Sequence, residues 1–396
     1  MNRHRKVALI QSICPHYRVP FFARLAGRVD LTVLHGRGDR EGAWRNAERI
    51  EGFVHQELRA MRFGLRRFHP YLKVSWIPGL FRALRRLRPE LVVSEGLTSF
   101  PNTLAAYLYC RSARIPFVVW DAGRRSDKPM PLVRKLLEPI NSFLLTRADA
   151  CIGYGSVARA SFLAWGVQAD RIFVAQNSID VEAIQHDRAR LLADRPGLSA
   201  LAQRLGVEGH IVFLYVGAIE ARKRLEDVVT AMRTLRADGH RVAVLIVGDG
   251  PHLPALRAFT HADSGRGVVF AGRVTDGVGA YHLVSDIAVL PGPGGLSINL
   301  AMAYGLPVVV RGGDGTEEDL IDDGVSGWCV STAAQMESRL RELVLDTALR
   351  ERTAAGALAS IGRYGLANMC DRFEAAMEYA WTHHSYAGRP ALPAVE

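Results

Sequence analysis

The sequence predicts an α/β protein built from two Rossmann-like domains, each a parallel sheet with helices on both faces. Short apolar runs suited to buried strands alternate with helical segments, and this alternation is typical of parallel sheets. The rhythm stops in a polar, helical stretch near 181–208 and then starts again. At 396 residues the chain is also long for one hydrophobic core, which favours two domains.

The first half contributes six predicted strands, separated mostly by helices. We expect strands at 7–10, 31–34, 91–93, 117–120, 150–152 and 172–175, and helices at 78–87, 103–111 and 132–146. Ligands of parallel sheets collect at the carboxyl ends of the strands. Four polar side chains fall at or just past such ends and become candidates for ligand contact: His16, Arg18, Glu95 and Asp121.

The second half repeats the pattern. Strands are expected at 211–216, 242–247, 268–271, 286–290, 306–310 and 328–330, and helices at 225–235, from 296 onward, across most of 332–358, and at 367–379. The expected domains are 1–183 and 209–366, with a connector at 184–208. A C-terminal helix at 367–385 is expected to pack back toward the first domain, followed by a loose tail at 386–396.

Composition indicates a soluble globular protein, with 48% hydrophobic and 23% charged residues. No apolar run approaches the roughly 18 residues of a membrane span, and the basic start leads into a predicted strand without a signal-peptide cleavage pattern. We therefore expect a cytoplasmic location. The five cysteines are scattered and form no CxxC pair, so we interpret them as reduced core residues and predict no metal site.

Charge is distributed unevenly along the chain. Residues 1–150 hold 27 Lys and Arg against 12 Asp and Glu, whereas the remainder holds 23 against 28. The first half is therefore expected to meet an acidic partner.

The stretch 285–310 is the most informative one, and it reads SDIAVLPGPGGLSINLAMAYGLPVVV. It predicts a buried strand, a glycine-rich turn, a helix and a second strand. Glycines before a helix let a ligand approach the backbone, where the N–H groups of Leu296, Ser297 and Ile298 and the helix dipole favour an anion. A diphosphate is the anion that we expect there, and a simple tight turn is the alternative.

Several motifs of the second half resemble a known family. They are FLYVGAIEARKRLEDVVTAM at 213–232, VLIVGDGP at 244–251, VVFAGRV at 268–274, the glycine-turn stretch, and EEDLIDDGVSGW at 317–328. Together they resemble family 4 of the retaining nucleotide-sugar glycosyltransferases. The resemblance implies the GT-B fold, in which two Rossmann-like domains face each other with a donor cleft between them.

Two shorter matches lie in the first half. The segment IFVAQNSID at 172–180 looks like the family's hinge, and PHYRVPFF at 15–22 resembles the opening of members that build bacterial surface polysaccharides.

The resemblance implies particular donor contacts. By position Lys223 matches the family lysine that contacts the donor diphosphate, and a flexible ammonium suits phosphate. Its alternative is a solvated cation in the loop ARKR, and the alternative for Ser297 is a plain helix cap. The full set of implied donor-binding residues is Gly217, Arg222, Lys223, Gly294, Gly295, Leu296, Ser297 and Glu318.

The chain departs from the family pattern around the glycine turn. The family places two glutamates eight positions apart, and this chain has Gly292 and Leu300 there. Ribose would then need another polar partner, for which Ser297, Asn299 or Glu318 are candidates.

A second departure lies in the first half. Many members carry a histidine near the sugar in a WxHG motif, whereas the corresponding segment here is VVWDAGRRSD, with Asp121 and Ala122. Asp121 is our candidate polar group at the sugar, and capping of the turn before Arg124 is its alternative role.

The implied reaction is transfer of a sugar from a UDP- or GDP-sugar to a hydroxyl of a glycan or lipid-linked glycan, with retention, in bacterial polysaccharide or glycolipid biosynthesis. The catalytic candidates are Asp121 and Lys223, and the acceptor-side candidates are His16, Arg18 and Glu95. The chain has no DxD motif and no His/Cys cluster, so no metal or other cofactor is needed to explain diphosphate binding. The helix end and Lys223 would stabilise the leaving nucleoside diphosphate.

Residues 59–89 are the candidate surface for a polyprenyl-diphosphate-linked acceptor and an anionic membrane. The segment 59–76 interleaves basic with aromatic residues: Arg59, Arg62, Arg66, Arg67 and Lys73 with Phe63, Phe68, Tyr71 and Trp76. In 80–87, Leu80, Leu84 and Leu87 share one helical face. The alternative is an ordinary surface element packed on the sheet. A peripheral position at the inner face of the cell membrane would follow from the first interpretation.

Three other functions are compatible with parts of the sequence. A nucleotide-sugar 2-epimerase shares the GT-B fold but should need acid/base side chains that we cannot assign. A binding protein without turnover would explain the absent glutamates. Nucleic-acid binding, suggested by a pI near 9.6, lacks an accompanying motif.

Overall fold

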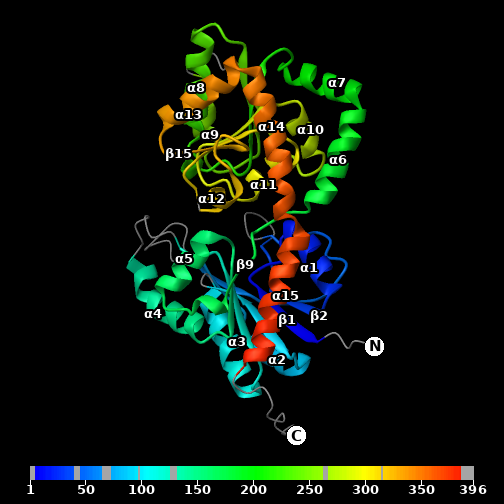
Figure 1. Ribbon diagram of the computed structural model, residues 1–396, viewed down its shortest axis with the longest axis vertical. Helices are drawn as coiled ribbons and strands as arrows, with labels where there is room; N and C mark the ends of the chain where they lie inside the picture. Colours follow the sequence, from blue (N-terminus) through cyan, green and yellow to red (C-terminus); the bar gives the residue numbers. More distant parts are fainter. Residues whose placement is uncertain are drawn as a thin grey trace. The chain divides into compact units, whose positions relative to one another are not determined.

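The computed structural model describes residues 5–39, 45–64, 73–96, 99–124, 132–261, 266–313 and 315–384, with the backbone alone for 64, 73 and 132–137. The chain forms two compact units. The first comprises Met1–Ile179 and Leu366–Glu396, and the second comprises Asp180–Gly365. The C-terminal helix therefore belongs to the unit that the N-terminal half builds (Figure 1).

The first unit contains a seven-stranded parallel sheet in the order β3-β2-β1-β6-β7-β8-β9. Its strands are β1 (Lys6–Gln11), β2 (Asp30–Gly36), β3 (Val54–Leu58), β6 (Leu91–Glu95), β7 (Phe117–Asp121), β8 (Ala150–Gly153) and β9 (Ile172–Val174). The strand order reverses between β1 and β6. In open parallel sheets such a switch point is where ligands bind, beyond the carboxyl ends of the strands.

Helices cover both faces of this sheet, as Figure 1 shows. They are η1 (His16–Arg18), α1 (Val19–Ala26), α2 (Leu80–Leu87), α3 (Phe100–Ala113), α4 (Leu132–Thr146), α5 (Ser156–Ala164), η3 (Ala169–Arg171) and α15 (Leu366–His383). Alternate residues of β1 serve the two faces, because side chains of a strand point to opposite sides in turn. Val7 and Leu9 pack toward α1 and α15, whereas Ala8 and Ile10 pack with α2, α3 and α5.

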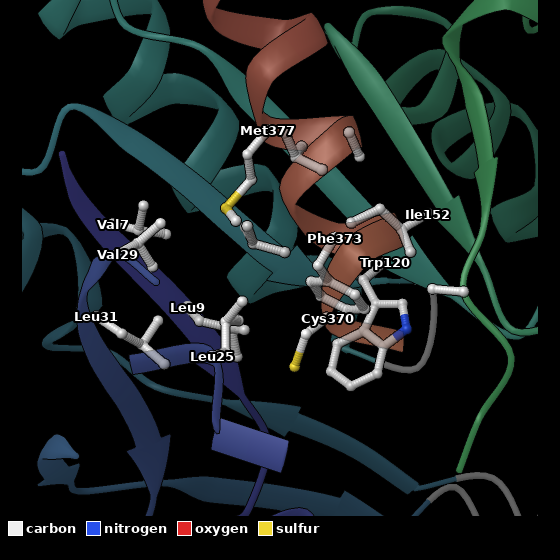
Figure 2. Packing of buried hydrophobic residues seen from close by; sticks show 14 of the residues in the cluster. Val7, Leu9, Leu25, Val29, Leu31, Trp120, Ile152, Cys370, Phe373 and Met377 are labelled. Carbon is white, nitrogen blue, oxygen red and sulfur yellow. The ribbon is translucent and has the colours of Figure 1, made fainter. Parts of the chain in front are cut away.

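An aromatic cluster joins α15 to the sheet. The Phe373 ring lies 4.9 Å from the Trp120 ring and 4.8 Å from the Phe21 ring, in edge-on geometry. Figure 2 shows Phe373 and Met377 of α15 packed beside Trp120 and Ile152 of the sheet. Truncating such a buried aromatic side chain costs about 3–5 kcal/mol, so α15 is an integral part of this unit.

Two features of the first unit were not predicted as strands. The edge strand β3 is almost wholly exposed and polar, so it carries no hydrophobic signal. A separate antiparallel hairpin pairs β4 (Met61–Gly64) with β5 (Lys73–Trp76), in a register that places Met61 opposite Trp76. Residues 66–68 and 71 of the predicted basic-aromatic segment lie outside the described residues.

The second unit holds a six-stranded parallel sheet in the order β12-β11-β10-β13-β14-β15. Its strands are β10 (Ile211–Val216), β11 (Val242–Val247), β12 (Val268–Gly272), β13 (Ile287–Leu290), β14 (Val308–Arg311) and β15 (Gly327–Val330). Here the strand order reverses between β10 and β13. The predicted glycine turn follows β13, and Gly217 follows β10, so both lie at the switch point.

The helices of the second unit include the predicted connector. They are α6 (Val181–Ala193), α7 (Arg195–Leu205), η4 (Ala221–Lys223), α8 (Leu225–Ala237), α9 (Leu253–His261), α10 (Val278–Leu283), α11 (Leu296–Ala303), α12 (Thr316–Leu320), α13 (Ala333–Leu345), α14 (Thr347–Ile361) and η5 (Gly362–Tyr364). The stretch 184–208 forms most of α6 and α7. Tyr304 fixes α6 to the end of α11, since its hydroxyl donates to Asp187 at 2.7 Å and its carbonyl accepts from Arg188 at 3.0 Å.

Two predictions from composition concern membrane-spanning helices and the cysteines. In the part of the chain that the structure describes, no helix is both long and apolar enough to cross a bilayer. Four cysteines are buried, but Cys329 is exposed, so its prediction as a core residue was wrong. The reason is that Cys329 lies on the edge strand β15 and its side chain points to the face opposite that of its buried neighbours Trp328 and Val330.

Candidate functional site

The glycine turn and the lysine loop of the second unit pack against each other. A Cβ atom at Gly292 would lie 2.5 Å from the Arg222 carbonyl oxygen and 2.9 Å from the Lys223 Cα. Only glycine therefore allows this approach. Gly295, the residue before α11, has φ 54° and ψ −139°, a backbone conformation that side-chain-bearing residues rarely adopt.

Lys223 is directed at this turn. Its side chain is half-buried, and its Nζ donates a hydrogen bond to the Pro293 carbonyl oxygen. The local backbone supports this placement, because η4 ends at Arg224 in the left-handed region and α8 starts immediately afterwards. Arg311 of β14 holds the first turn of α8 through an ion pair with Asp227. The lysine is thus positioned by packing rather than left as a freely solvated loop cation.

Ser297 joins the first turn of α11 to the end of β10. Its hydroxyl donates to the Val216 carbonyl oxygen at 3.0 Å. The residue before the helix is Gly295, which makes no side-chain cap, so the capping role considered for Ser297 was wrong.

The N–H groups of α11 are less open than the sequence suggested. Those of Ser297 and Ile298 donate back to the carbonyls of Gly294 and Gly295 at 3.3 and 3.2 Å, because the helix begins with a tight turn. Among the described residues, the Leu296 N–H has no backbone acceptor. The groups that could attract an anion at this turn are therefore one amide without a backbone acceptor in the described ranges, the helix dipole and the nearby ammonium of Lys223.

Gly217 begins a second close backbone contact. A Cβ at Gly248 would lie 1.9 Å from the Gly217 carbonyl oxygen, and the Gly217 N–H donates to Val247 at 3.0 Å. The Ile219 N–H donates to the Asp249 carbonyl at 2.9 Å. The loops that follow β10 and β11 therefore run side by side, which explains the glycines of the motif GDGP.

The remaining donor-side candidates, Arg222 and Glu318, are exposed, and the buried contacts beside Glu318 are made by its neighbour Glu317. Arg222 is exposed and pairs with Glu220 at 2.5 Å. Glu318 is exposed on α12, whereas Glu317 is buried and accepts the N–H groups of Gly313 and Gly315 at 2.5 and 3.0 Å. Glu317 thus shapes the loop after β14. Asn299 is buried, and Leu300, at the second glutamate position, is half-buried.

Asp121 and Glu95 stand at the carboxyl ends of β7 and β6 in the first unit. Asp121 Oδ1 accepts the Gly123 N–H at 2.7 Å, which is the turn contact foreseen as its alternative role. A Cβ at Gly96 would lie 2.4 Å from Asp121 Oδ2, so the carboxylate packs tightly against the end of β6. Glu95 accepts the Ser12 N–H at 2.7 Å and so bridges the switch point between β6 and β1.

Arg18 is buried in an aromatic pocket, while His16 is exposed. The guanidinium lies 4.2 Å from the centroid of the Trp120 ring and donates to Tyr154 Oη at 3.1 Å. Burial raises the pKa of the Tyr154 hydroxyl; the Arg18 charge opposes this shift and the Glu95 charge adds to it. Sequence reasoning did not single out Trp120 or Tyr154, because both have the ordinary appearance of core aromatics.

The structure brings the candidates together in two groups. Lys223, Gly294, Gly295, Leu296, Ser297 and Gly217 gather at the switch point of the second unit. Arg18, Glu95 and Asp121 lie at strand ends of the first unit. Among the described residues, no group of three or more His, Cys, Asp or Glu side chains is arranged to hold a metal ion.

Family models match both units. The model described as "Glycosyl transferase 4-like domain" matches residues 17–178, and that described as "Glycosyl transferases group 1" matches residues 210–346.

Two curated proteins are similar to the chain over long alignments. It is 30% identical over 303 residues to the alpha-D-kanosaminyltransferase of Streptomyces kanamyceticus, covering 72% of this chain and 77% of that protein. It is 29% identical over 238 residues to a GDP-mannose-dependent alpha-(1-6)-phosphatidylinositol monomannoside mannosyltransferase of Mycobacterium tuberculosis, covering 55% and 54%. The chain thus spans about half the length of that mannosyltransferase.

Solved structures share the fold. Anabaena HepE in complex with UDP superposes with a TM-score of 0.73 at 17% identity, over 94% of this chain and 99% of HepE. The HepE complex with UDP-glucose gives a TM-score of 0.71 at 18% identity, over 95% and 100%. At these identities the likeness establishes the fold alone.

Proposed function

Because the chain belongs to the glycosyltransferases and has the GT-B fold of two Rossmann-like domains, we propose that it transfers a hexose from a nucleotide-sugar donor to a hydroxyl of a glycan or lipid-linked acceptor. Membership of this family makes it an enzyme of the hexosyltransferase class. The contact of Lys223 with the glycine turn and the names of the relatives support this donor and this acceptor.

The contact between Lys223 and the glycine turn carries the proposal. An ammonium held beside the open end of α11 provides a fixed positive charge and an amide donor at one point. A nucleoside diphosphate presents a negative charge that such a site complements. The same groups suit the reaction, since charge builds on the diphosphate as the bond to the sugar breaks.

The donor nucleotide is proposed to be UDP or GDP. HepE has been solved with UDP and UDP-glucose, and the mycobacterial relative is named as GDP-mannose-dependent. A thermal-shift comparison of UDP-, GDP-, dTDP- and ADP-sugars tests this, because a ligand that binds only the folded state raises the unfolding temperature. If no sugar nucleotide stabilises or is turned over by the purified protein, the proposal is wrong.

Retention at the anomeric carbon is proposed from the family resemblance, and Asp121 remains our candidate polar group at the sugar. Its Oδ1 bond to Gly123 leaves the carboxylate fixed in orientation rather than mobile. An Asp121→Asn variant keeps the shape and removes the charge. We expect donor binding to persist and turnover to fall; NMR of the product from the wild-type enzyme reports the anomeric configuration.

The acceptor is proposed to be a glycan or a lipid-linked glycan of bacterial polysaccharide or glycolipid biosynthesis. The name of the mycobacterial relative gives a phosphatidylinositol glycolipid as its substrate, which supports a lipid-linked acceptor here. His16, Arg18 and Glu95 are the proposed acceptor-side residues, since they lie at or beyond strand ends of the first unit.

A membrane-facing role is proposed for the β4–β5 hairpin. Met61, Phe63 and Trp76 are 37%, 46% and 38% exposed, and the pairing register puts all three on one face. The opposite face is turned inward, because Ser75 is buried and Arg62 pairs with Asp39 at 2.5 Å. Arg62 was therefore wrongly predicted as a membrane-facing cation. Four exposed arginines lie close to the hairpin in the sequence and add positive charge there: Arg59, Arg82, Arg85 and Arg86.

The helix that follows the hairpin fits the simpler alternative. Leu80 and Leu84 of α2 are fully buried against the sheet, so this helix is an ordinary amphipathic surface helix. The membrane proposal is thereby confined to the hairpin.

Two rival functions make distinct predictions. An epimerase would convert a UDP-sugar alone into an epimer, without an acceptor. A binding protein would be stabilised by a sugar nucleotide without transferring the sugar to any acceptor. Incubation with and without a lipid-linked acceptor, followed by chromatography of the nucleotide and sugar products, separates both from a transferase.

A further inference from the structure

Arg18 is a cation that the first unit buries almost completely, at 3% exposure. Its Nη2 donates to Tyr154, but its Nη1 is withdrawn from solvent and has no hydrogen-bond acceptor among the described residues. Burying a charged donor without an acceptor is energetically costly, so such donors are rare in native structures. We therefore expect a bound group to supply the hydrogen-bond acceptor for Nη1.

Aromatic faces surround this guanidinium. Its central carbon lies 4.2 Å from the centroid of the Trp120 ring, 5.3 Å from that of Tyr154 and 5.5 Å from that of Tyr17. Cation–π attraction holds the group in place but satisfies none of its N–H bonds. No described carboxylate forms an ion pair with Arg18, and Glu95 uses one oxygen to accept the Ser12 N–H.

A second donor beside the guanidinium shows the same imbalance. Trp120 Nε1 is buried and has no acceptor among the residues that the structure describes. Figure 2 shows the Trp120 nitrogen on the side of the ring away from Leu9 and Leu25. Both groups that lack a partner within the described ranges, Arg18 Nη1 and Trp120 Nε1, are donors, so the group that complements them is one that only accepts hydrogen bonds.

We propose that Arg18, with Trp120, forms a subsite for a phosphate group carried by the acceptor substrate. This inference rests on the proposed glycosyltransferase function, because the acceptor is what brings the phosphate. A phosphate offers several acceptor oxygens and matches the fork geometry of a guanidinium. Tyr17 is 38% exposed and borders the guanidinium, so the phosphate enters on its side.

The phosphate has two possible carriers, a soluble sugar or polyol phosphate and a lipid headgroup. The test is isothermal titration calorimetry of the full chain with glycerol 3-phosphate and, in a separate arm, with short-chain phosphatidylglycerol below its micelle concentration. Binding in the first arm alone identifies a soluble phosphorylated acceptor, and binding in the second identifies a headgroup. Either result supports the subsite if it depends on Arg18.

Three variants establish that dependence. Arg18→Met is expected to weaken phosphate binding roughly tenfold or more, since it removes a charge-assisted bond. Trp120→Phe keeps an aromatic ring under the guanidinium and removes one donor, so a smaller loss is expected; it remains informative if Arg18→Met does not fold. Arg28→Met is the control, because Arg28 pairs with Asp371 and Glu374 on the surface of the same unit.

UDP binding to the same proteins separates this inference from the proposed function. If wild-type protein binds UDP but neither phosphate probe, or binds a probe equally well after Arg18→Met and Trp120→Phe, the subsite is refuted while the donor site stands. If wild-type protein binds no nucleotide, the proposed function itself fails. We expect UDP affinity to be unchanged by Arg18→Met, since the proposed donor residues belong to the second unit.

Discussion

Lys223 and Pro293 are 70 positions apart in the sequence, and they meet because their loops leave adjacent strands, β10 and β13. Arg224, directly after the lysine, adopts φ 53° and ψ 42°. For a residue other than glycine this conformation costs about 1–2 kcal/mol. The packing of the glycine turn against the lysine loop holds the ammonium at the turn, where we propose that the donor diphosphate binds.

His282 makes the stability of the second unit depend on pH. The side chain is buried on α10, its Nδ1–H donates to the Val278 carbonyl at 2.9 Å, and its ring stacks on Tyr304. Burial lowers its pKa from 6.5 to about 4. Between pH 6.5 and pH 4 the His282 side chain is therefore protonated in the unfolded chain but neutral in the folded unit. The free energy of unfolding consequently falls as the pH drops from 6.5 toward 4.

We therefore expect His282→Gln to lose less stability on acidification than the wild type. Between pH 7.5 and pH 5 the wild type should lose about 2 kcal/mol more free energy of unfolding than the His282→Gln variant. Urea denaturation at the two pH values measures it. Parallel pH dependence of both proteins would show that folding leaves the pKa of His282 unchanged.

Among individual residues, some could be predicted from the sequence and others could not. Lys223 was identifiable because a motif surrounds it, and its contact confirms that it faces the glycine turn. Of the pair Glu317 and Glu318 the sequence favoured the second, but Glu317 is the buried one. Two adjacent glutamates differ only in the helical face that they occupy. The loop before α12 sets the residue at which the helix starts, and this start determines which of the two is buried.

At the scale of elements, the glycine turn depends on close backbone contact. Gly292→Ala would place a methyl group 2.5 Å from the Arg222 carbonyl and 2.9 Å from Lys223 Cα, so the two loops must separate. We expect the affinity for UDP to fall roughly tenfold, because the lysine retreats from the turn. Isothermal titration calorimetry measures it.

Gly362→Ala is the matched control for this change. A Cβ at Gly362 meets nothing within 4 Å, and its φ of −57° suits alanine. If the two variants bind UDP equally well, the close approach at Gly292 has no role in binding.

The β4–β5 hairpin yields a prediction about membranes. Phe63→Ser with Trp76→Ser should reduce binding to vesicles of phosphatidylcholine and phosphatidylglycerol several-fold, since two apolar side chains no longer enter the interface. Flotation of vesicles with bound protein measures this. Leu345→Ser, an exposed leucine of the second unit, is the control. Equal flotation of all three proteins would contradict a membrane role for the hairpin.

At the scale of the whole molecule, most elements could be predicted because their buried residues carry a clear period. The helices 132–146 and 225–235 and the strands 211–216 and 242–247 correspond closely to α4, α8, β10 and β11. The edge strand β3 and the β4–β5 hairpin were not predicted. Their apolar residues are few or face outward, so no core signal reveals them.

The aromatic surroundings of Arg18 could not be predicted from the sequence. Arg18, Trp120 and Tyr154 come from three separate segments that only the folded sheet brings together. No local pattern distinguishes an arginine that becomes buried from one that stays on the surface.

Transfer without a metal is a prediction for the intact enzyme. We expect the rate with the preferred sugar nucleotide to be unchanged in excess EDTA, since the ammonium and helix terminus neutralise the diphosphate. Steady-state assays with EDTA, with and without added Mg²⁺, measure this. A rate that vanishes with EDTA and returns with Mg²⁺ would show that a cation takes part.

The affinity of the Lys223→Met variant for UDP tests the central proposal most directly. Isothermal titration calorimetry is run on wild type, on Lys223→Met and on Arg204→Met, an exposed arginine of α7 in the same unit. We expect Lys223→Met to bind UDP at least roughly tenfold more weakly, and Arg204→Met to bind like the wild type. Unchanged UDP affinity in a folded Lys223→Met protein would contradict the proposal that this lysine holds the donor diphosphate.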